Sequence, residues 1–254
     1  MCTVVILRRP DHEWPVIIGA NRDEMRSRPW TPPSRHWSDR PHVVAGLDSL
    51  AGGTWLGRND DGVVAAVMNR ERSLGPTPGK RSRGELPLEA LDHADAAEAA
   101  MALAALDPDA YRPFNMLIAD NQDAYWLCNR SSAERIEMEK LPPGWSMLTS
   151  HRLNDPKCPR TAAYLPRFER APTPEPDRND WTAWQLLLAS GPLDASSDTK
   201  SALCVETDAG FGTISSTLIA LPSVAKMEQI TDRLGYFLFA SGPPNEAPFE
   251  SVSE

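Results

Sequence analysis

The sequence predicts a layered α+β protein, because blocks of predicted strands and helices alternate along its 254 residues, a pattern that is compatible with two antiparallel sheets covered by helices. Three observations support this prediction. Runs rich in β-branched residues open the chain, and an Ala/Leu/Glu-rich stretch at 84–106 has apolar residues three and four apart. Later apolar runs return to the strand pattern, and short polar turns separate neighbouring strands, as is typical of hairpins. Periodicity alone does not choose among the α+β folds.

The N-terminal third begins with a predicted strand at Cys2–Leu7 and an antiparallel partner at Val16–Asn21. The segment Arg26–Pro41 holds four prolines, so we expect an irregular crossing with little regular structure. A second hairpin is predicted at Thr54–Gly57 and Val63–Asn69, around the turn sequence Asn-Asp-Asp-Gly.

The remainder of the chain continues the alternation of helices and strands. Two helices, or one interrupted helix, are predicted within 84–106. The other expected elements are strands at Phe114–Ala119, Ala124–Cys128, Ile136–Met138, Met147–Thr149, Ala202–Val205, Thr213–Leu221 and Phe237–Phe239, and helices at Arg160–Arg170 and Trp181–Ser190. We expect one domain over 1–241 and a disordered tail over 242–254, which is rich in Glu, Pro and Ser.

Composition excludes several classes of function. A net charge of −9 argues against a nucleic acid or an anionic membrane as the main partner. No segment approaches the roughly 18 apolar residues of a membrane span, and no secretory signal is evident, so we expect a soluble, cytoplasmic protein. The spacing of the histidines and cysteines matches no metal or redox motif, so we expect neither a metal nor a resident cofactor. The sequence does not predict an oligomeric state.

The second residue is the principal candidate for chemistry. Removal of Met1 would make Cys2 the N-terminal residue and place a free amine beside its thiol. An α-amine has an unperturbed pKa of roughly 7.7–8.0, so it can act as the base for that thiol. The alternative is that Cys2 is a small packing residue at the start of a buried strand.

A series of short motifs resembles the NRDE family, which includes the transport-and-Golgi-organisation proteins. These motifs run in order over most of the chain: Met1–Thr3, Asn21–Glu24, Ser27–Pro29, Ala45–Asp48, Gly52–Gly57, Asn69–Arg70, Ser82–Leu86, Phe114–Leu117, Gly212–Thr213 and Ser215–Thr217. More distantly, the Met-Cys-Thr start and the Arg/Asp segment resemble the choloylglycine hydrolase and penicillin V acylase group of N-terminal-nucleophile (Ntn) hydrolases.

The resemblance implies a fold and a chemistry. The fold is an Ntn-hydrolase-like αββα four-layer sandwich with two antiparallel sheets. The chemistry is that of an N-terminal cysteine amidohydrolase, acting on a non-peptide C–N bond of a small amide or acyl ligand after Met1 is removed. The alternative is a non-catalytic binding or trafficking protein for heme or acyl-lipid ligands, since some relatives of the family have been linked to such roles.

The resemblance also implies roles for four further residues. Arg22 would lower the pKa of the Cys2 thiol, and Asp23 would accept a hydrogen bond from its α-amine. Whether Asp23 or the following glutamate faces the nucleophile stays open, because alternate strand residues point to opposite faces. Asn69 would supply an oxyanion donor, unless it is an ordinary strand-end asparagine, and His151 could donate from a ring nitrogen where the acylases use an asparagine.

Two positions depart from the family pattern. The family usually has Ser-Asn where this chain has Ser150-His151, with Asn154 as a nearby alternative donor. The late motif is usually Gly-Thr-Arg, and Ile214 stands here in place of that arginine. Isoleucine carries no charge, so these two departures favour either altered chemistry or binding without cleavage.

Overall fold

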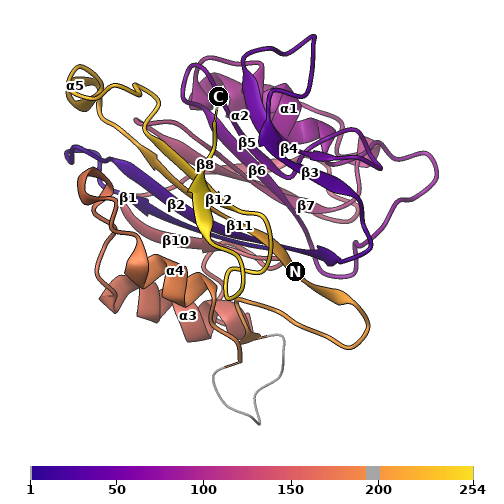
Figure 1. Cartoon of the computed structure of the whole chain (residues 1–254). Helices are drawn as coiled ribbons and strands as arrows, with labels where there is room; N and C mark the ends of the chain where they lie inside the picture. The colour runs from indigo at the N-terminus through magenta and orange to yellow at the C-terminus, as the bar shows by residue number, and fades with distance from the viewer. Residues whose placement is uncertain (1, 193–200, 254) are drawn as a thin grey trace. The chain divides into compact units, whose positions relative to one another are not determined.

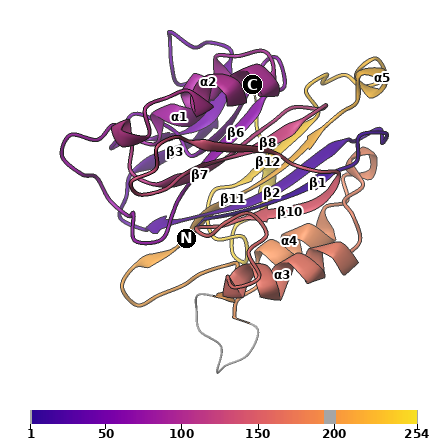
Figure 2. The same cartoon turned by 180° about the vertical axis from the view of Figure 1, so that it is seen from behind.

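The computed structural model describes residues 2–192 and 201–253, and Figures 1 and 2 show it from opposite sides. The described chain divides into two units. The first joins the N-terminal segment, up to Arg28, with Pro143–Val252, whereas the second contains Pro29–Pro142. The first unit therefore takes its residues from both ends of the chain, and it continues past the predicted boundary at 241.

The first unit is a six-stranded antiparallel sheet in the order β10-β1-β2-β11-β12-β13. Helices α3 and α4 pack on one of its faces (Figure 1). The strands are β1 (Thr3–Arg8), β2 (Val16–Met25), β10 (Gly144–Leu148), β11 (Phe211–Leu221), β12 (Tyr236–Ala240) and β13 (Phe249–Ser251). The helices are α3 (Pro159–Arg170), α4 (Thr182–Leu188) and α5 (Val224–Met227), with a 3-10 turn at Pro176–Arg178.

The second unit is a seven-stranded antiparallel sheet in the simple order β3 to β9. Helices α1 and α2 pack on it, mainly against β5 to β8 (Figure 2). The strands are β3 (Trp30–Ser34), β4 (Val43–Asp48), β5 (Leu56–Asn59), β6 (Val64–Asn69), β7 (Phe114–Ala119), β8 (Ala124–Asn129) and β9 (Glu137–Lys140). The helices are α1 (Glu85–Leu91) and α2 (Ala96–Ala104), with a 3-10 turn at Pro108–Ala110.

These two antiparallel sheets with their helices confirm the predicted α+β class. The hairpin β5–β6 and the pair of helices within 84–106 lie where the sequence places them. In the described ranges, no helix has the length and apolar content needed to cross a bilayer.

Several predicted boundaries are wrong. β2 continues from Asn21 to Met25, and β3 lies inside the proline-rich crossing, where an edge strand tolerates proline because it needs fewer ladder bonds. Ala202–Val205 does not form the predicted strand. The backbone N–H groups of Leu203 and Cys204 both donate to the Ser190 carbonyl oxygen and not to a neighbouring strand. Phe249–Ser251 of the predicted tail pairs with β12, so those residues are not disordered.

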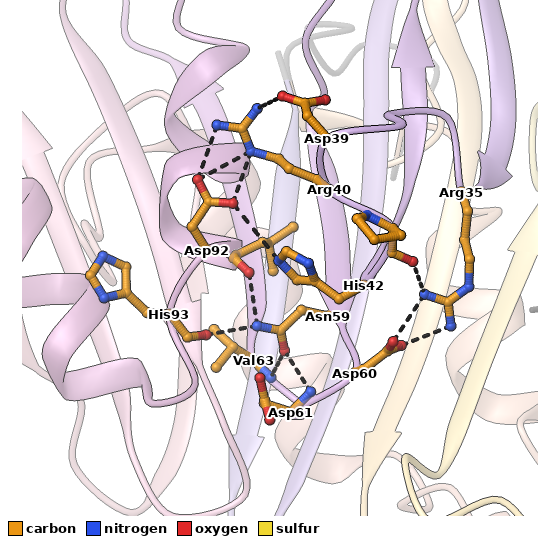
Figure 3. Close-up of polar contacts among 12 residues, drawn as sticks. Arg35, Asp39, Arg40, His42, Asn59, Asp60, Asp61, Val63, Asp92 and His93 are labelled. Carbon is orange, nitrogen blue, oxygen red and sulfur yellow. Dashed lines mark hydrogen bonds and ion pairs between the residues drawn. The ribbon is translucent and has the colours of Figure 1, made fainter.

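An asparagine organises the turn of the β5–β6 hairpin (Figure 3). The Asn59 side-chain amide donates to the backbone oxygens of Leu91 and His93, at 2.9 and 2.7 Å. Its carbonyl oxygen accepts from the backbone N–H groups of Asp61 and Val63, at 3.1 and 2.8 Å. One buried side chain therefore satisfies four backbone groups and ties the hairpin to the end of α1, a role that suits Asn because it both donates and accepts.

The core of the first unit lies between its sheet and helices α3 and α4. Alternate residues of β1 and β2, such as Val5 and Ile17, pack there against aromatic side chains of the helices, including Phe168 and Trp184. Gly19 lies opposite Val5 in the β1–β2 ladder, and a Cβ built on it would lie only 3.1 Å from Cε3 of Trp184. The absence of a side chain at this position lets the helix layer pack closely against β2.

We expect Gly19→Val to destabilise the protein by about 1–3 kcal/mol, because the added methyl groups would overpack the contact with Trp184. Urea unfolding measures this cost. Gly191→Ala is the control, since a Cβ there meets no atom within 4 Å. Equal stability of the two variants would contradict the tight packing of α4 on β2.

Candidate active site

Cys2 lies immediately before β1 in the first unit, next to the Asn-Arg-Asp-Glu segment of β2. Its Sγ is 3.7 Å from the backbone carbonyl oxygen of Asp23. Cys2 is partly exposed. The structure thus brings the two ends of the predicted N-terminal motif together.

The ladder of the sheet places Cys2 and Arg22 on one face. Thr3 pairs with Asn21, so one further step along this antiparallel register puts Cys2 opposite Arg22. Directly opposite residues share a face, and successive residues alternate between faces. Asn21 and Asp23 therefore lie on the other face, which carries α3 and α4.

Asp23 is held on the helix face by a closed set of contacts. Its Oδ2 lies 3.1 Å from Nη1 of Arg160, an ion pair in which the two side chains are 0% and 3% exposed. Its Oδ1 accepts a hydrogen bond of 2.7 Å from the Thr213 hydroxyl. The same Nη1 of Arg160 donates to the Thr3 hydroxyl at 2.7 Å. The charge of Asp23 is thereby compensated inside the unit, which a buried carboxylate requires.

Asn21 is satisfied on the same face. Its side-chain amide donates to the backbone oxygens of Leu188 and Leu203, at 2.9 and 3.0 Å. Its carbonyl oxygen accepts from the Ser216 hydroxyl at 2.7 Å. These partners explain why β2 continues through the polar motif that the sequence indicates as a strand end: each of these buried polar side chains finds a hydrogen bond.

The surroundings of Cys2 keep its thiol protonated. Burial is the main cause that raises the pKa of the Cys2 thiol, and the Asp23 carboxylate raises it further. The guanidinium of Arg22, itself 5% exposed, acts in the opposite direction. Since burial outweighs the positive charge, the thiol needs a nearby base before it can act as a nucleophile.

Asp23 contacts the thiol through its backbone carbonyl oxygen, whereas the Glu24 carboxylate contacts the backbone N–H of Met25 and lies near Arg28. The carboxylate of Glu24 accepts a hydrogen bond of 2.9 Å from the backbone N–H of Met25 and lies 3.9 Å from Arg28. The Asp23 carboxylate itself lies on the helix face, with Arg160 and Thr213. The Asp23 carbonyl oxygen contacts Sγ, and the Asp23 carboxylate acts on the thiol by its charge.

His151 follows β10 in the same unit. The β1–β10 register pairs Val4 with Leu148, the last residue of β10, so His151 lies three residues beyond the end of that ladder. The Ser150 hydroxyl lies 3.2 Å from Nδ1 of His151, and the backbone N–H of His151 donates to the Thr149 hydroxyl at 3.2 Å. Asn154 has a different use, because its side-chain oxygen accepts a hydrogen bond of 2.7 Å from the backbone N–H of Met147.

Asn69 belongs to the second unit. It ends β6 opposite Phe114, and Phe114 packs in the core formed with α1 and α2. The register thus places Asn69 on the helix-bearing face of its own sheet. The structure groups Cys2, Arg22, Asp23 and His151 in the first unit, and Asn69 in the second.

Ile214 is the extra residue of a β-bulge. Thr213 pairs with Asp23 and Ser215 pairs with Arg22, so the ladder skips Ile214. The bulge lets Thr213 reach the Asp23 carboxylate on the helix face while Ser215 shares the face of Arg22. Ser215 is 1% exposed, and within the described part of the chain its hydroxyl makes no hydrogen bond.

Three residues of this arrangement are not predicted by the sequence pattern. Arg160 lies in a predicted helix, and nothing local distinguishes it from the other basic residues there. Thr213 and Ser215 lie in a recognised motif, but their faces depend on a bulge that periodicity does not reveal. A Thr/Ser-rich stretch in an otherwise apolar strand is the one available signal for Thr213 and Ser215.

Comparison with known sequences identifies the relatives of the chain. The family model of Transport and Golgi organisation 2 matches residues 1–234. The Transport and Golgi organization 2 homolog of Mus musculus is 33% identical over 148 residues, which cover 56% of this chain and 52% of that protein. The Homo sapiens homolog is 30% identical over 148 residues, which again cover 56% of this chain and 52% of that protein. The matched part is thus about half the length of these relatives.

Comparison with solved structures identifies the fold. The Caenorhabditis elegans ortholog of N-acylethanolamine-hydrolyzing acid amidase superposes with a TM-score of 0.59 at 11% identity, covering 99% of this chain and 100% of that one. A mutant of the conjugated bile acid hydrolase from Clostridium perfringens gives 0.52 at 12% identity, covering 100% and 97%. The fold is therefore that of the Ntn hydrolases.

We expect Asp23→Asn to cost about 3–5 kcal/mol of unfolding free energy, because it leaves the buried charge of Arg160 uncompensated. Urea unfolding is the measurement. Asp208→Asn, an exposed position in the same unit, should stay within about 0.5 kcal/mol of the parent. A small effect of Asp23→Asn would show that the ion pair contributes little to stability.

Proposed function

Because this chain belongs to the Transport and Golgi organisation 2 family and has an Ntn-hydrolase fold, we propose that it is an N-terminal cysteine amidohydrolase. One observation carries the proposal. The Cys2 thiol lies beside the Asp23 carbonyl oxygen, and the sheet register places Cys2 opposite the buried Arg22. Removal of Met1 would complete this site by adding a free amine to the residue that carries the thiol.

The proposed reaction cleaves an amide through a thioester. The α-amine of Cys2 takes the proton of the thiol, and Sγ attacks the carbonyl carbon of the ligand. The C–N bond then breaks as the leaving nitrogen takes that proton, and an acyl thioester remains on Cys2. Water adds to the thioester carbon and gives one proton to the amine. The carboxylic acid departs as the sulfur regains that proton.

The raised pKa of the thiol makes the amine necessary. A thiol that stays protonated at neutral pH is a weak nucleophile until a base removes its proton. Arg22, the residue opposite Cys2, stays protonated and cannot be that base, whereas an α-amine has a suitable pKa. Arg22 then stabilises the negative sulfur that forms during proton transfer.

Polar groups beside Cys2 in the first unit can stabilise the tetrahedral intermediate. Ser215 shares the face of Arg22, and no other described residue forms a hydrogen bond with its hydroxyl, whereas His151 stays a candidate donor from the family resemblance. Donors of this kind lower the barrier when they point to the developing oxyanion. Asn69 stays a prediction from the family resemblance.

The proposed substrate is a small amide whose acyl group is apolar. The two structural neighbours are named for hydrolysing N-acylethanolamines and conjugated bile acids, which pair an apolar acid with a small polar group. Ile214, 6% exposed, stands where the family usually has an arginine, so this position offers an apolar side chain in place of a positive charge.

Binding without cleavage is the second candidate, and the same Ile214 favours it, because a positive charge is missing from this position. In that case acyl-lipids or heme would be ligands rather than substrates, and removal of Met1 would not be required. Whether the isolated protein turns over an N-acyl amide or only binds it decides between the two candidates.

We expect the purified native-start protein to lack Met1 and to be alkylated by iodoacetamide fastest at Cys2. The control cysteines are Cys128 and Cys158, which are 0% and 1% exposed. Intact mass followed by peptide mapping measures both properties. Retention of Met1, or a Cys2 rate no faster than that of the buried cysteines, would exclude the N-terminal-nucleophile mechanism.

The pH dependence of alkylation tests the role of Arg22. Because Arg22 lowers the pKa of the Cys2 thiol, Arg22→Gln should move the midpoint of the rate profile to higher pH. The rate at neutral pH should fall with the thiolate population, by about tenfold if the pKa of the thiol rises by one. Arg26→Gln, an exposed position, should leave the midpoint unchanged. An unchanged midpoint in Arg22→Gln would contradict the electrostatic role.

Hydrolysis of N-acylethanolamines of increasing chain length tests the activity itself. We expect Cys2→Ala to abolish turnover and Cys2→Ser to reduce it by at least about a thousandfold, since the attacking atom is removed or weakened. A thioester adduct on the parent protein, seen as a mass increase equal to the acyl group, would support the mechanism. Undiminished turnover in Cys2→Ala would exclude it.

A further inference from the structure

Arg160 is a charged side chain buried in the helix face of the first unit. It is the second residue of α3, and its side chain is 3% exposed. Burial of a guanidinium is costly unless its charge is compensated, so a buried arginine usually has a specific partner. Of the other basic residues of α3, Arg167 and Arg170 are exposed in the ordinary way.

Two contacts of Arg160 converge on the strands beside Cys2. Its Nη1 donates to Oγ1 of Thr3 at 2.7 Å and to Oδ2 of Asp23 at 3.1 Å. Thr3 is the residue that follows Cys2 in the chain. Asp23 supplies the backbone oxygen that lies 3.7 Å from Sγ. A single nitrogen therefore joins the strand that carries the thiol to the strand that faces it.

We propose that Arg160 is a positioning residue for the Cys2 nucleophile, acting through Thr3 and Asp23. This inference rests on the proposed function, because it assigns a role in presenting Cys2 for attack. Arg160 lies on the helix face, whereas Cys2 shares the opposite face with Arg22, so Arg160 orients the thiol from behind without touching the substrate.

The fixed position of Asp23 depends on two donors. Thr213 holds one carboxylate oxygen at 2.7 Å, and Arg160 holds the other. Thr213 is in turn tied to the chain by a hydrogen bond of 2.8 Å from the backbone N–H of Val205 to its hydroxyl. Removal of Arg160 would take away one donor to the Asp23 carboxylate and one donor to the Thr3 hydroxyl, and the geometry of Cys2 against the Asp23 carbonyl would loosen.

The charge of Arg160 also bears on the thiol. Within the described residues, the charged groups that act on the Cys2 thiol are Arg22 and Asp23 of β2, and Arg160 of α3 pairs with that aspartate. The Asp23 carboxylate disfavours a thiolate, and Arg160 compensates that carboxylate. Without Arg160 the negative charge of Asp23 would act more strongly on Cys2 and raise the pKa of its thiol further.

The test compares the pH profile of Cys2 alkylation in Arg160→Gln, Arg160→Lys and the parent protein. We expect Arg160→Gln to shift the midpoint to higher pH and to slow alkylation at about pH 7.5 by about tenfold, the ratio that corresponds to a pKa difference of one. Arg160→Lys restores the charge and should recover most of the rate. Arg170→Gln, the same change at an exposed position of α3, should match the parent.

Circular dichroism shows whether Arg160→Gln folds. If it does not fold, Thr3→Val tests the same contact in its place. This variant removes one acceptor of Arg160 and preserves side-chain volume and the ion pair with Asp23. We expect slower alkylation of Cys2 with little change in the midpoint, because geometry changes while charge does not.

The outcomes separate this inference from the proposed function. If the parent retains Met1 or shows no selective alkylation of Cys2, the proposed function fails, and the inference that rests on it fails as well. If the parent reacts selectively while folded Arg160→Gln and Thr3→Val keep its rate and midpoint, only the role of Arg160 is overturned. A shifted midpoint that lysine restores supports it.

Discussion

The buried ion pair between Asp23 and Arg160 is the interaction on which the arrangement around Cys2 depends. Its two partners lie 137 positions apart in the chain, and both side chains are almost fully enclosed. Burial of either charge alone would be strongly unfavourable, so the pair forms as one unit with Thr213 and Thr3 completing its hydrogen bonds. This network connects β1, β2, β11 and α3.

Because successive strand residues point to opposite faces, the Asn-Arg-Asp-Glu motif has side chains on both faces of the sheet, and the two sets have different roles. Asn21 and Asp23 point to the helix face and hold the backbone of the sheet by contacts with residues from α3, α4 and β11. Arg22 points to the opposite face, which it shares with Cys2 and Ser215. A motif of four consecutive polar residues can therefore remain inside a strand, since one set anchors the strand and the other faces the candidate chemistry.

The properties of Cys2 follow from the balance between burial and charge. Burial and Asp23 favour the neutral thiol, whereas Arg22 favours the thiolate. A thiol held neutral is protected from adventitious oxidation and alkylation, and the proposed mechanism activates it only when a base on the same residue is available. Under this proposal, Met1 removal is the step that converts a buried packing residue into a nucleophile, so the two alternatives for Cys2 describe the same chain before and after processing.

Local properties of the sequence are sufficient to predict the α+β class, the position of most strands and helices, the family motifs and the candidacy of Cys2, Arg22 and Asp23. These properties are apolar periodicity, turn residues such as the Asn59–Gly62 segment, and short runs of characteristic residues. Long-range contacts, in contrast, extend β2 to Met25, send Thr213 and Ser215 to different faces through a bulge, and pair Arg160 with Asp23. The physical reason is that buried polar groups are placed by partners distant in the chain, and a local pattern carries no information about which partner each one finds.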